Sequence, residues 1–193
     1  PEHISSYSLI LEEGTPFFDS EEIRRQLPDE MVDREMYERT KEILHEKGYE
    51  RYEISNYAKD SFACRHNLGY WDGVPYLGLG LGASSYYNEA RFANETSMAK
   101  YLKEPFVPFR GRQDYFVTTK KDRMEDYMIF GLRKMGGVSL SRFEREFGVS
   151  MEEVYGEVIR RYVALKLLEV KGDAVRLTDK GIDVSNRIFE DFL

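Results

Sequence analysis

The chain has 193 residues, 41% of them hydrophobic, and a net charge of −7 from 28 basic and 35 acidic side chains. This length suits one or two domains, and the hydrophobic fraction excludes a disordered chain. The acidic balance argues against a nucleic-acid-binding protein, which normally carries a basic surplus. One cysteine excludes an internal disulfide and a multi-cysteine metal site, and it favours a reducing, cytoplasmic location.

The N-terminal half has the pattern of an α/β fold. Residues 4–11 are β-branched, aromatic or apolar, which is typical of a strand buried on both faces. Residues 30–47 carry apolar side chains at helical spacing, and Gly48 follows as the C-cap. Residues 49–55 have the composition of a second strand. The order strand, helix, strand therefore predicts a βαβ unit and a parallel sheet.

The middle of the chain has a different composition. Residues 56–92 are rich in glycine, asparagine, aspartate and aromatics, and we expect a long loop of the kind that usually carries function. A short helix is expected over 97–103. Pro105, Pro108 and Gly111 then mark a connector that breaks regular structure.

We place the domain boundary in that connector, so that residues 1–113 and 114–193 form two domains. In the second, Ser150 and Glu153 have the spacing of a capping box, and Gly172-Asp173 is a two-residue hairpin signal. Helices are predicted over 120–134, 139–147, 150–168 and 178–192, with a hairpin over 169–177. This order outlines a mostly helical, winged-helix-like domain.

The rarest side chains of the sequence gather in residues 64–71. Cys64 and Trp71 are the only residues of their types, His66 is one of three histidines, and Asn67 and Tyr70 lie between them. This grouping indicates a ligand-binding segment. The alternative is that His66 and Asn67 satisfy backbone groups in a loop while the aromatic rings pack in a core. Cys64 is either a metal ligand or a small buried apolar side chain.

Glycines alternate with leucines over Gly78–Gly82, which has the period of a strand. Glycine in a strand lets a ligand or another backbone approach closely. The alternative is that these glycines only relieve crowding against a helix. The segment lacks the strand–turn–helix frame of a dinucleotide fingerprint.

Taken together, these segments resemble the oxygen-independent coproporphyrinogen III oxidase-like radical SAM proteins, and most closely their HemW branch of haem chaperones. The matching segments are His3–Ser5 with Glu12–Thr15, Tyr52–Asn56, His66–Trp71, Gly78–Ala83 and, near the C-terminus, Phe143, Phe147–Gly148, Leu177–Thr178 and Phe192–Leu193. The resemblance covers essentially the whole chain.

The resemblance implies a partial TIM-like barrel that holds a [4Fe–4S] cluster and S-adenosylmethionine, followed by a small helical domain. The three-cysteine motif of the cluster and the early barrel strands are absent, so the chain resembles the C-terminal portion of such a protein. We therefore expect no radical chemistry from this chain alone. Its truncated barrel edge is expected to favour association with another chain.

The resemblance also implies roles for individual residues. His66, Asn67, Tyr70 and Trp71 match a family element associated with haem binding. An imidazole ligates haem iron, aromatic rings cover a porphyrin face, and Asn67 is expected to orient the imidazole. Cys64 is a weaker candidate ligand.

The resemblance places S-adenosylmethionine against the end of a late barrel strand, at Gly82, Ala83 and Ser84. A further contact is expected near Ile10 in the first strand. Relatives usually carry histidine at the position of Ser84, so a side-chain role there is in doubt while a backbone contact survives.

The function implied is that of a haem chaperone, which binds haem and passes it to acceptor haemoproteins in the cytoplasm or at the membrane face. One alternative is the oxidase, which removes carboxyl groups from porphyrinogen propionates by radical chemistry. The other is a winged-helix binding module. Its long helix and hairpin balance acidic with basic side chains, so no nucleic acid partner is expected.

Overall fold

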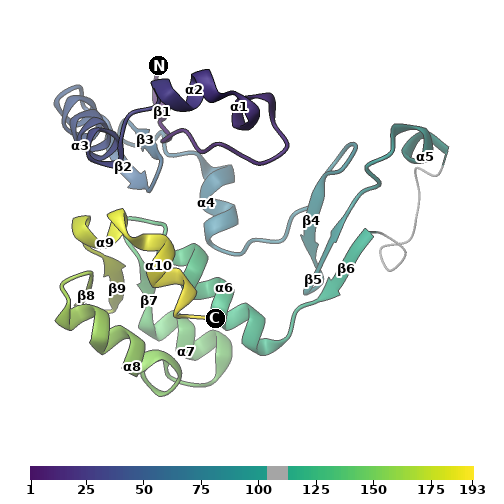
Figure 1. The fold of residues 1–193 in the computed structure, drawn as a ribbon. Helices are drawn as coiled ribbons and strands as arrows, with labels where there is room; N and C mark the ends of the chain where they lie inside the picture. Colours follow the sequence, from purple (N-terminus) through teal and green to yellow (C-terminus); the bar gives the residue numbers. More distant parts are fainter. Residues whose placement is uncertain (104–112) are drawn as a thin grey trace.

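The computed structural model describes residues 1–103 and 113–193, which form a mixed α/β structure with three small sheets (Figure 1). Every strand pair in these residues is antiparallel. The predicted connector at Pro105, Pro108 and Gly111 lies outside the described residues. Within the described ranges, none of the helices combines the length and hydropathy that crossing a bilayer requires.

The first sheet corrects the prediction of a parallel arrangement. Its order is β1 (His3–Ser5), β3 (Asn56–Ala58), β2 (Glu50–Glu53). β3 comes from the predicted loop and inserts between the two predicted strands, pairing antiparallel with both. The strand expected over residues 4–11 is also shorter and less buried than predicted, because its apolar side chains after Ser5, including Ile10 at 78% exposure, face solvent.

Three helices connect β1 to β2, and each begins at a polar side chain that caps its first turn. They are α1 (Pro16–Asp19), α2 (Glu21–Gln26) and α3 (Glu30–Glu46), with Thr15, Ser20 and Asp29 as N-caps. The prediction of a helix over 30–47 is confirmed, and Gly48 follows it with a φ of 80°. None of the three helices contains a buried residue.

The prediction of a loop over 56–92 is wrong, because this segment also contains α4 (Arg65–Trp71), β4 (Ser84–Tyr87) and β5 (Ala90–Ala93). After α5 (Met98–Lys103), which confirms the predicted short helix, β6 (Gln113–Val117) pairs with β5 in a sheet of order β4-β5-β6. Figure 1 shows this sheet as an arm that extends away from the helical part of the molecule, with α5 near its far end.

The second half follows the prediction closely. The predicted helices are present, the hairpin turns at Gly172 with a φ of 60°, and β7 completes a sheet of order β7-β9-β8. The closing helix is divided at Val184, whose backbone is not helical. The elements are α6 (Lys120–Gly131), β7 (Val138–Ser139), α7 (Leu140–Phe147), α8 (Met151–Ala164), β8 (Leu168–Lys171), β9 (Ala174–Leu177), α9 (Asp179–Asp183) and α10 (Ser185–Glu190).

The main hydrophobic cluster lies entirely within residues 128–192, where Phe143 and Val175 are fully buried. β2 connects the first half to this region. The backbone N–H of Ile54 donates to the carbonyl of Arg133 at 3.1 Å, and that of Met135 donates to the carbonyl of Tyr52 at 3.1 Å. The segment after α6 is therefore tied to the first sheet by backbone hydrogen bonds.

We expect Ser150→Ala to lower the free energy of unfolding by about 1 kcal/mol, because Ser150 caps the first turn of α8. Its hydroxyl accepts from the N–H of Glu153 at 3.2 Å, and the Glu153 carboxylate accepts from the N–H of Ser150 at 2.9 Å. Urea denaturation measures the change, and Ser8→Ala, at an exposed serine outside any helix or strand, is the control.

The same capping box gives a pH dependence with a defined sign. Hydrogen bonds from the backbone and hydroxyl of Ser150 lower the pKa of Glu153. A carboxylate with a lowered pKa stabilises the fold above its ordinary pKa and loses that effect as the pH falls through its folded value. The cost of Ser150→Ala is therefore expected to shrink in acid, and a cost that stays constant down to pH 2 would contradict this account.

Candidate functional site

Helix α4 carries the motif of rare side chains. His66 and Tyr70 are four residues apart, so they lie on one face of the helix, and their rings meet edge to face with centroids 4.7 Å apart. Tyr70 meets the ring of Tyr76 in the same way, also at 4.7 Å. His66 is exposed, and within the described ranges its ring nitrogens have no hydrogen-bond partner. The imidazole is therefore available to a ligand beside two aromatic rings.

Asn67 lies next to His66 in α4, but its amide hydrogen-bonds to another residue. Neighbouring residues on a helix do not face each other, and the Asn67 amide instead donates to the hydroxyl of Tyr52 at 3.4 Å. The same hydroxyl lies 2.9 Å from Nε2 of His3, on β1. Burial raises the pKa of Tyr52. Asn67 thus links α4 to the first sheet, and its role beside the imidazole stays a prediction.

Trp71 packs against the helical region. Its ring centroid lies 6.3 Å from that of Phe130 on α6, and the guanidinium of Arg133 lies 4.8 Å from the ring centroid. The indole Nε1 is buried and has no hydrogen-bond partner among the described residues. The structure therefore brings His66 and Tyr70 together, whereas Trp71 anchors the end of α4 to α6.

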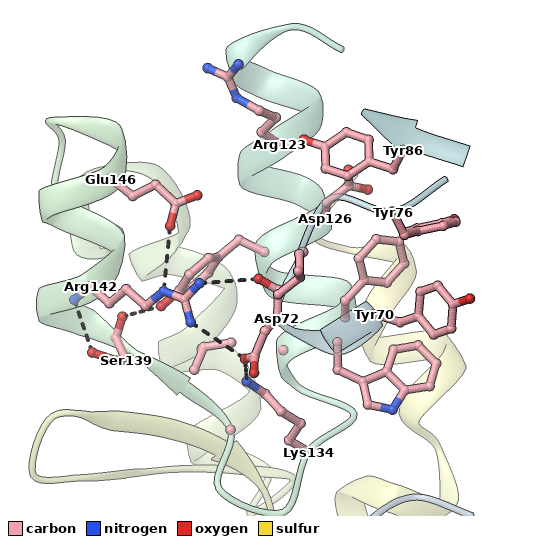
Figure 2. A pocket seen from close by; sticks show the side chains of 18 of the residues that line it. Tyr70, Asp72, Tyr76, Tyr86, Arg123, Asp126, Lys134, Ser139, Arg142 and Glu146 are labelled. Carbon is pink, nitrogen blue, oxygen red and sulfur yellow. Dashed lines mark hydrogen bonds and ion pairs between the residues drawn. The ribbon is translucent and has the colours of Figure 1, made fainter. Parts of the chain in front are cut away.

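A cleft of about 520 Å³ lies between the end of α4, the β4–β5 strands and the helices α6 and α7 (Figure 2). Its volume falls in the range of small-molecule sites. Tyr70 and Trp71 line it, but His66, Asn67 and Cys64 do not. Most of the other lining side chains are aromatic or charged. The aromatic ones are Tyr76, Tyr86, Tyr127 and Phe130, and the charged ones are Asp72, Arg91, Arg123, Asp126, Lys134, Arg142 and Glu146.

Ion pairs connect the walls of the cleft. Lys134 and Arg142 both face Asp72, the residue after α4. On the strand side, Arg91 pairs with Asp126. Burial raises the pKa of Asp126 although the Arg91 guanidinium opposes that rise. Sequence reasoning missed these residues, because partners such as Asp72 and Arg142 are 70 residues apart and belong to no local motif.

The segment predicted to contact S-adenosylmethionine is a turn rather than a strand. Gly80 and Gly82 have φ angles of 102° and 65°, values that favour glycine. A Cβ on Gly78 would collide with the backbone of Ser84, so this glycine relieves crowding within the chain itself. The alternation of glycine and leucine therefore reflects local packing, and the expectation of a strand here is wrong.

No hydrogen bond or ring contact within the described ranges joins Ile10 to Gly82, Ala83 or Ser84, the residues expected to contact S-adenosylmethionine. The N–H of Gly82 donates to the carbonyl of Glu95 at 3.0 Å, and the carbonyl of Ala83 accepts from the N–H of Asn94 at 3.0 Å. Ser84 begins β4 with an exposed side chain, and Ile10 is exposed in the first segment.

Cys64 occupies the N-cap position of α4 without a side-chain capping bond, and it is partly buried. In the part of the chain that the structure describes, no group of three or more histidine, cysteine, aspartate or glutamate side chains is arranged to hold a metal ion. The role of Cys64 as a ligand stays a prediction.

The chain is similar to known proteins over its whole length. The family model described as the HemN C-terminal domain matches residues 118–184. The heme chaperone HemW of Lactococcus lactis is 40% identical over 194 residues, covering 99% of this chain and 50% of that protein. HemW of Bacillus subtilis is 35% identical over 196 residues, covering 100% of this chain and 51% of that protein.

A solved structure shares the fold. It is described as coproporphyrinogen III oxidase (HemN) from Escherichia coli, a radical SAM enzyme, and it matches with a TM-score of 0.65 at 18% identity. The match covers 87% of this chain and 42% of that chain. This chain spans about half the length of the curated relatives that it matches. Over its whole length the chain is therefore HemW-like, with a HemN-type C-terminal domain over residues 118–184.

Proposed function

We propose that this chain is the haem-binding part of a haem chaperone that passes haem to acceptor haemoproteins. The observation that carries the proposal is the exposed imidazole of His66. Its ring nitrogens have no hydrogen-bond partner among the described residues, and its ring meets that of Tyr70 edge to face with centroids 4.7 Å apart. Relatives that match the whole chain are named heme chaperones, which supports haem as the cargo.

The residues of α4 suit this task chemically. A neutral imidazole ligates haem iron through one ring nitrogen, and aromatic side chains cover the apolar faces of a porphyrin. Tyr70 and Tyr76 stand next to His66 in a continuous row of edge contacts. A row of rings next to a ligand at the surface favours reversible loading, because the haem need not enter a closed core.

The residues present do not fit a [4Fe–4S] cluster. Such a cluster needs several cysteine thiolates, and this chain has one cysteine. The cluster that the family implies would have to be held elsewhere in a larger protein, and we derive no step from it.

For S-adenosylmethionine, the assignment of Ile10, Gly82, Ala83 and Ser84 rests on the family resemblance. The backbone N–H of Gly82 and the carbonyl of Ala83 already have partners within the chain. A ligand could therefore contact the exposed side chains of Ile10 and Ser84.

We further propose that the chain divides into two domains near the predicted boundary at 113/114. The family model begins at residue 118, and β6, which precedes it, pairs with β5 of the first part. The helices and the β7-β9-β8 sheet support a winged-helix-like region after the boundary. The piece of barrel rests on the family resemblance alone, because a TIM-like barrel is built of parallel strands and every described strand pair is antiparallel.

The location of the protein in the cell is also a proposal. A chain with a single cysteine suits the reducing cytoplasm. Peripheral membrane contact and association between chains are expected in addition.

In the helical region, arginines are paired with acidic side chains: Arg160 with Glu152, Arg161 with Asp191, and Arg176 with Glu169. These pairs neutralise the cations that would attract phosphates, which supports a packing role for this region over nucleic acid binding.

Stoichiometric haem titration, followed by the Soret band, tests the proposed function on the 193-residue chain. We expect saturation at one haem per chain and transfer to an apo-haemoprotein in a mixing experiment. Absence of a saturable Soret change would overturn the proposal. Decarboxylation of coproporphyrinogen by a larger protein containing this sequence, without haem transfer, would favour the oxidase instead.

A further inference from the structure

Aromatic and charged side chains share the lining of the cleft (Figure 2). Tyr70, Tyr76 and Tyr86 lie on one side together with Arg123 and Asp126. We call the part that holds Arg142 and Lys134 the ionic side. A ligand that matches both sides needs a flat apolar body and an anionic edge. A tetrapyrrole with propionate groups has this chemistry.

On the ionic side, Arg142 has N–H donors that are not used in hydrogen bonds. A guanidinium has five N–H donors, yet within the described ranges that of Arg142 makes a single hydrogen bond, from Nη2 to the backbone carbonyl of Asp72 at 3.2 Å. Its two neighbouring carboxylates, Asp72 and Glu146, are 3.6 and 3.7 Å away, beyond good hydrogen-bonding distance. The side chain is 44% exposed, so a ligand reaches its remaining donors from the cleft.

Lys134 supplies a second cation at the same place. Its ammonium pairs with the Asp72 carboxylate that Arg142 also faces, so two cations share one close carboxylate. Within the described residues, Glu146, on α7, lies near Arg142 alone, with its carboxylate 3.7 Å from Nε. The cations of the strand side are committed differently, because Arg91 pairs closely with Asp126 and Arg123 with Glu89. A carboxylate that enters the cleft is therefore expected to bind most strongly beside Arg142 and Lys134.

We propose that Arg142, supported by Lys134, binds a propionate carboxylate of the tetrapyrrole while its ring lies against the tyrosines of the cleft. The planar fork of a guanidinium matches the two oxygens of a carboxylate. The inference deepens the proposed function and rests on it. Tyr70 connects the two places, because it lines the cleft and its ring contacts His66, which does not itself line the cleft.

Titration of the chain with haem and with haem dimethyl ester, in which both propionates are esterified, tests the inference. We expect Arg142→Met to weaken haem binding about ten-fold, since a hydrogen bond to a charged group is lost. Arg142→Lys, which keeps the charge and loses the fork, is expected to fall between. The matched control is Arg145→Met, an exposed arginine on the same helix that does not line the cleft.

The ester separates this inference from the haem site itself. We expect the wild-type chain to bind the ester more weakly than haem. In Arg142→Met this difference should shrink, with only the part due to Lys134 left, and the Soret position should not change because the iron ligand is intact. Equal binding of haem and ester by the wild-type chain would overturn the inference and leave the proposed function standing. Failure of the wild-type chain to bind either one would overturn the proposed function first.

Discussion

His66→Ala is expected to remove most of the haem affinity of the chain. An axial imidazole contributes a direct bond to iron, so its loss should exceed the roughly 10–100-fold penalty for losing an outer hydrogen-bond partner of a metal ligand. The Soret band of any haem that still binds is expected to shift, because the iron would then carry a different ligand. Titration followed by absorbance measures both effects.

The control for this experiment is His45→Ala. His45 is another exposed histidine, near the end of α3, and its ring pairs with Glu50 instead of facing an aromatic row. It should leave the affinity and the spectrum unchanged. If His45→Ala weakens haem binding as strongly as His66→Ala, the haem is bound without a specific ligand and α4 loses its assigned role.

Tyr70→Phe adds a further distinction. This change keeps the ring that contacts His66 and Tyr76 and removes only the hydroxyl. Because the ring supplies the contact in this account, the affinity should change by less than about two-fold. Iron ligation through the Tyr70 oxygen would instead appear as a large loss and a changed spectrum.

The helical region was predictable because its signals are local. The capping box of Ser150 and Glu153 and the turn at Gly172 each specify backbone geometry over a few residues. The buried apolar residues of this region form one cluster within 128–192. Sequence patterns predict such a region well, because the fold and the local preferences agree.

The first half was harder to predict, since its strand pairing depends on a short segment inside a polar stretch. Asn56–Ala58 contains one large apolar side chain, Tyr57, and it looks like a loop in sequence. Yet Tyr57 is 1% exposed in the structure, where its strand separates β1 from β2. Long-range pairing of this kind leaves no periodicity, so a helix between two strands was misread as a βαβ unit.

The candidate site was predictable only in part, for a similar reason. The grouping of Cys64, His66 and Trp71 pointed to this segment, although the segment was predicted as part of a loop and is the helix α4. The cleft and its ion pairs were not predictable. Asp72, Lys134 and Arg142 are ordinary polar residues in sequence, and only the packing of α4 and α7 against α6 brings them together.

Phe143→Ala is expected to lower the free energy of unfolding by about 3–5 kcal/mol, the usual cost of removing a buried phenylalanine ring. Phe143 is fully buried. Its ring centroid lies 5.4 Å from that of Tyr127, 4.7 Å from that of Phe147 and 6.0 Å from that of Tyr155, so its loss leaves a cavity among three aromatic rings. Chemical denaturation monitored by circular dichroism measures the change.

The matched control for Phe143→Ala is Phe62→Ala, at a phenylalanine that is 54% exposed, where the cost should stay below about 1 kcal/mol. Equal costs for the two variants would mean that the cluster in residues 128–192 is not the main source of stability. A large cost for Phe143→Ala has a consequence for the site as well, because α7 carries both Phe143 and Arg142. Loosening the cluster should therefore also weaken haem binding, and it should do so without the shift of the Soret band that marks the loss of His66.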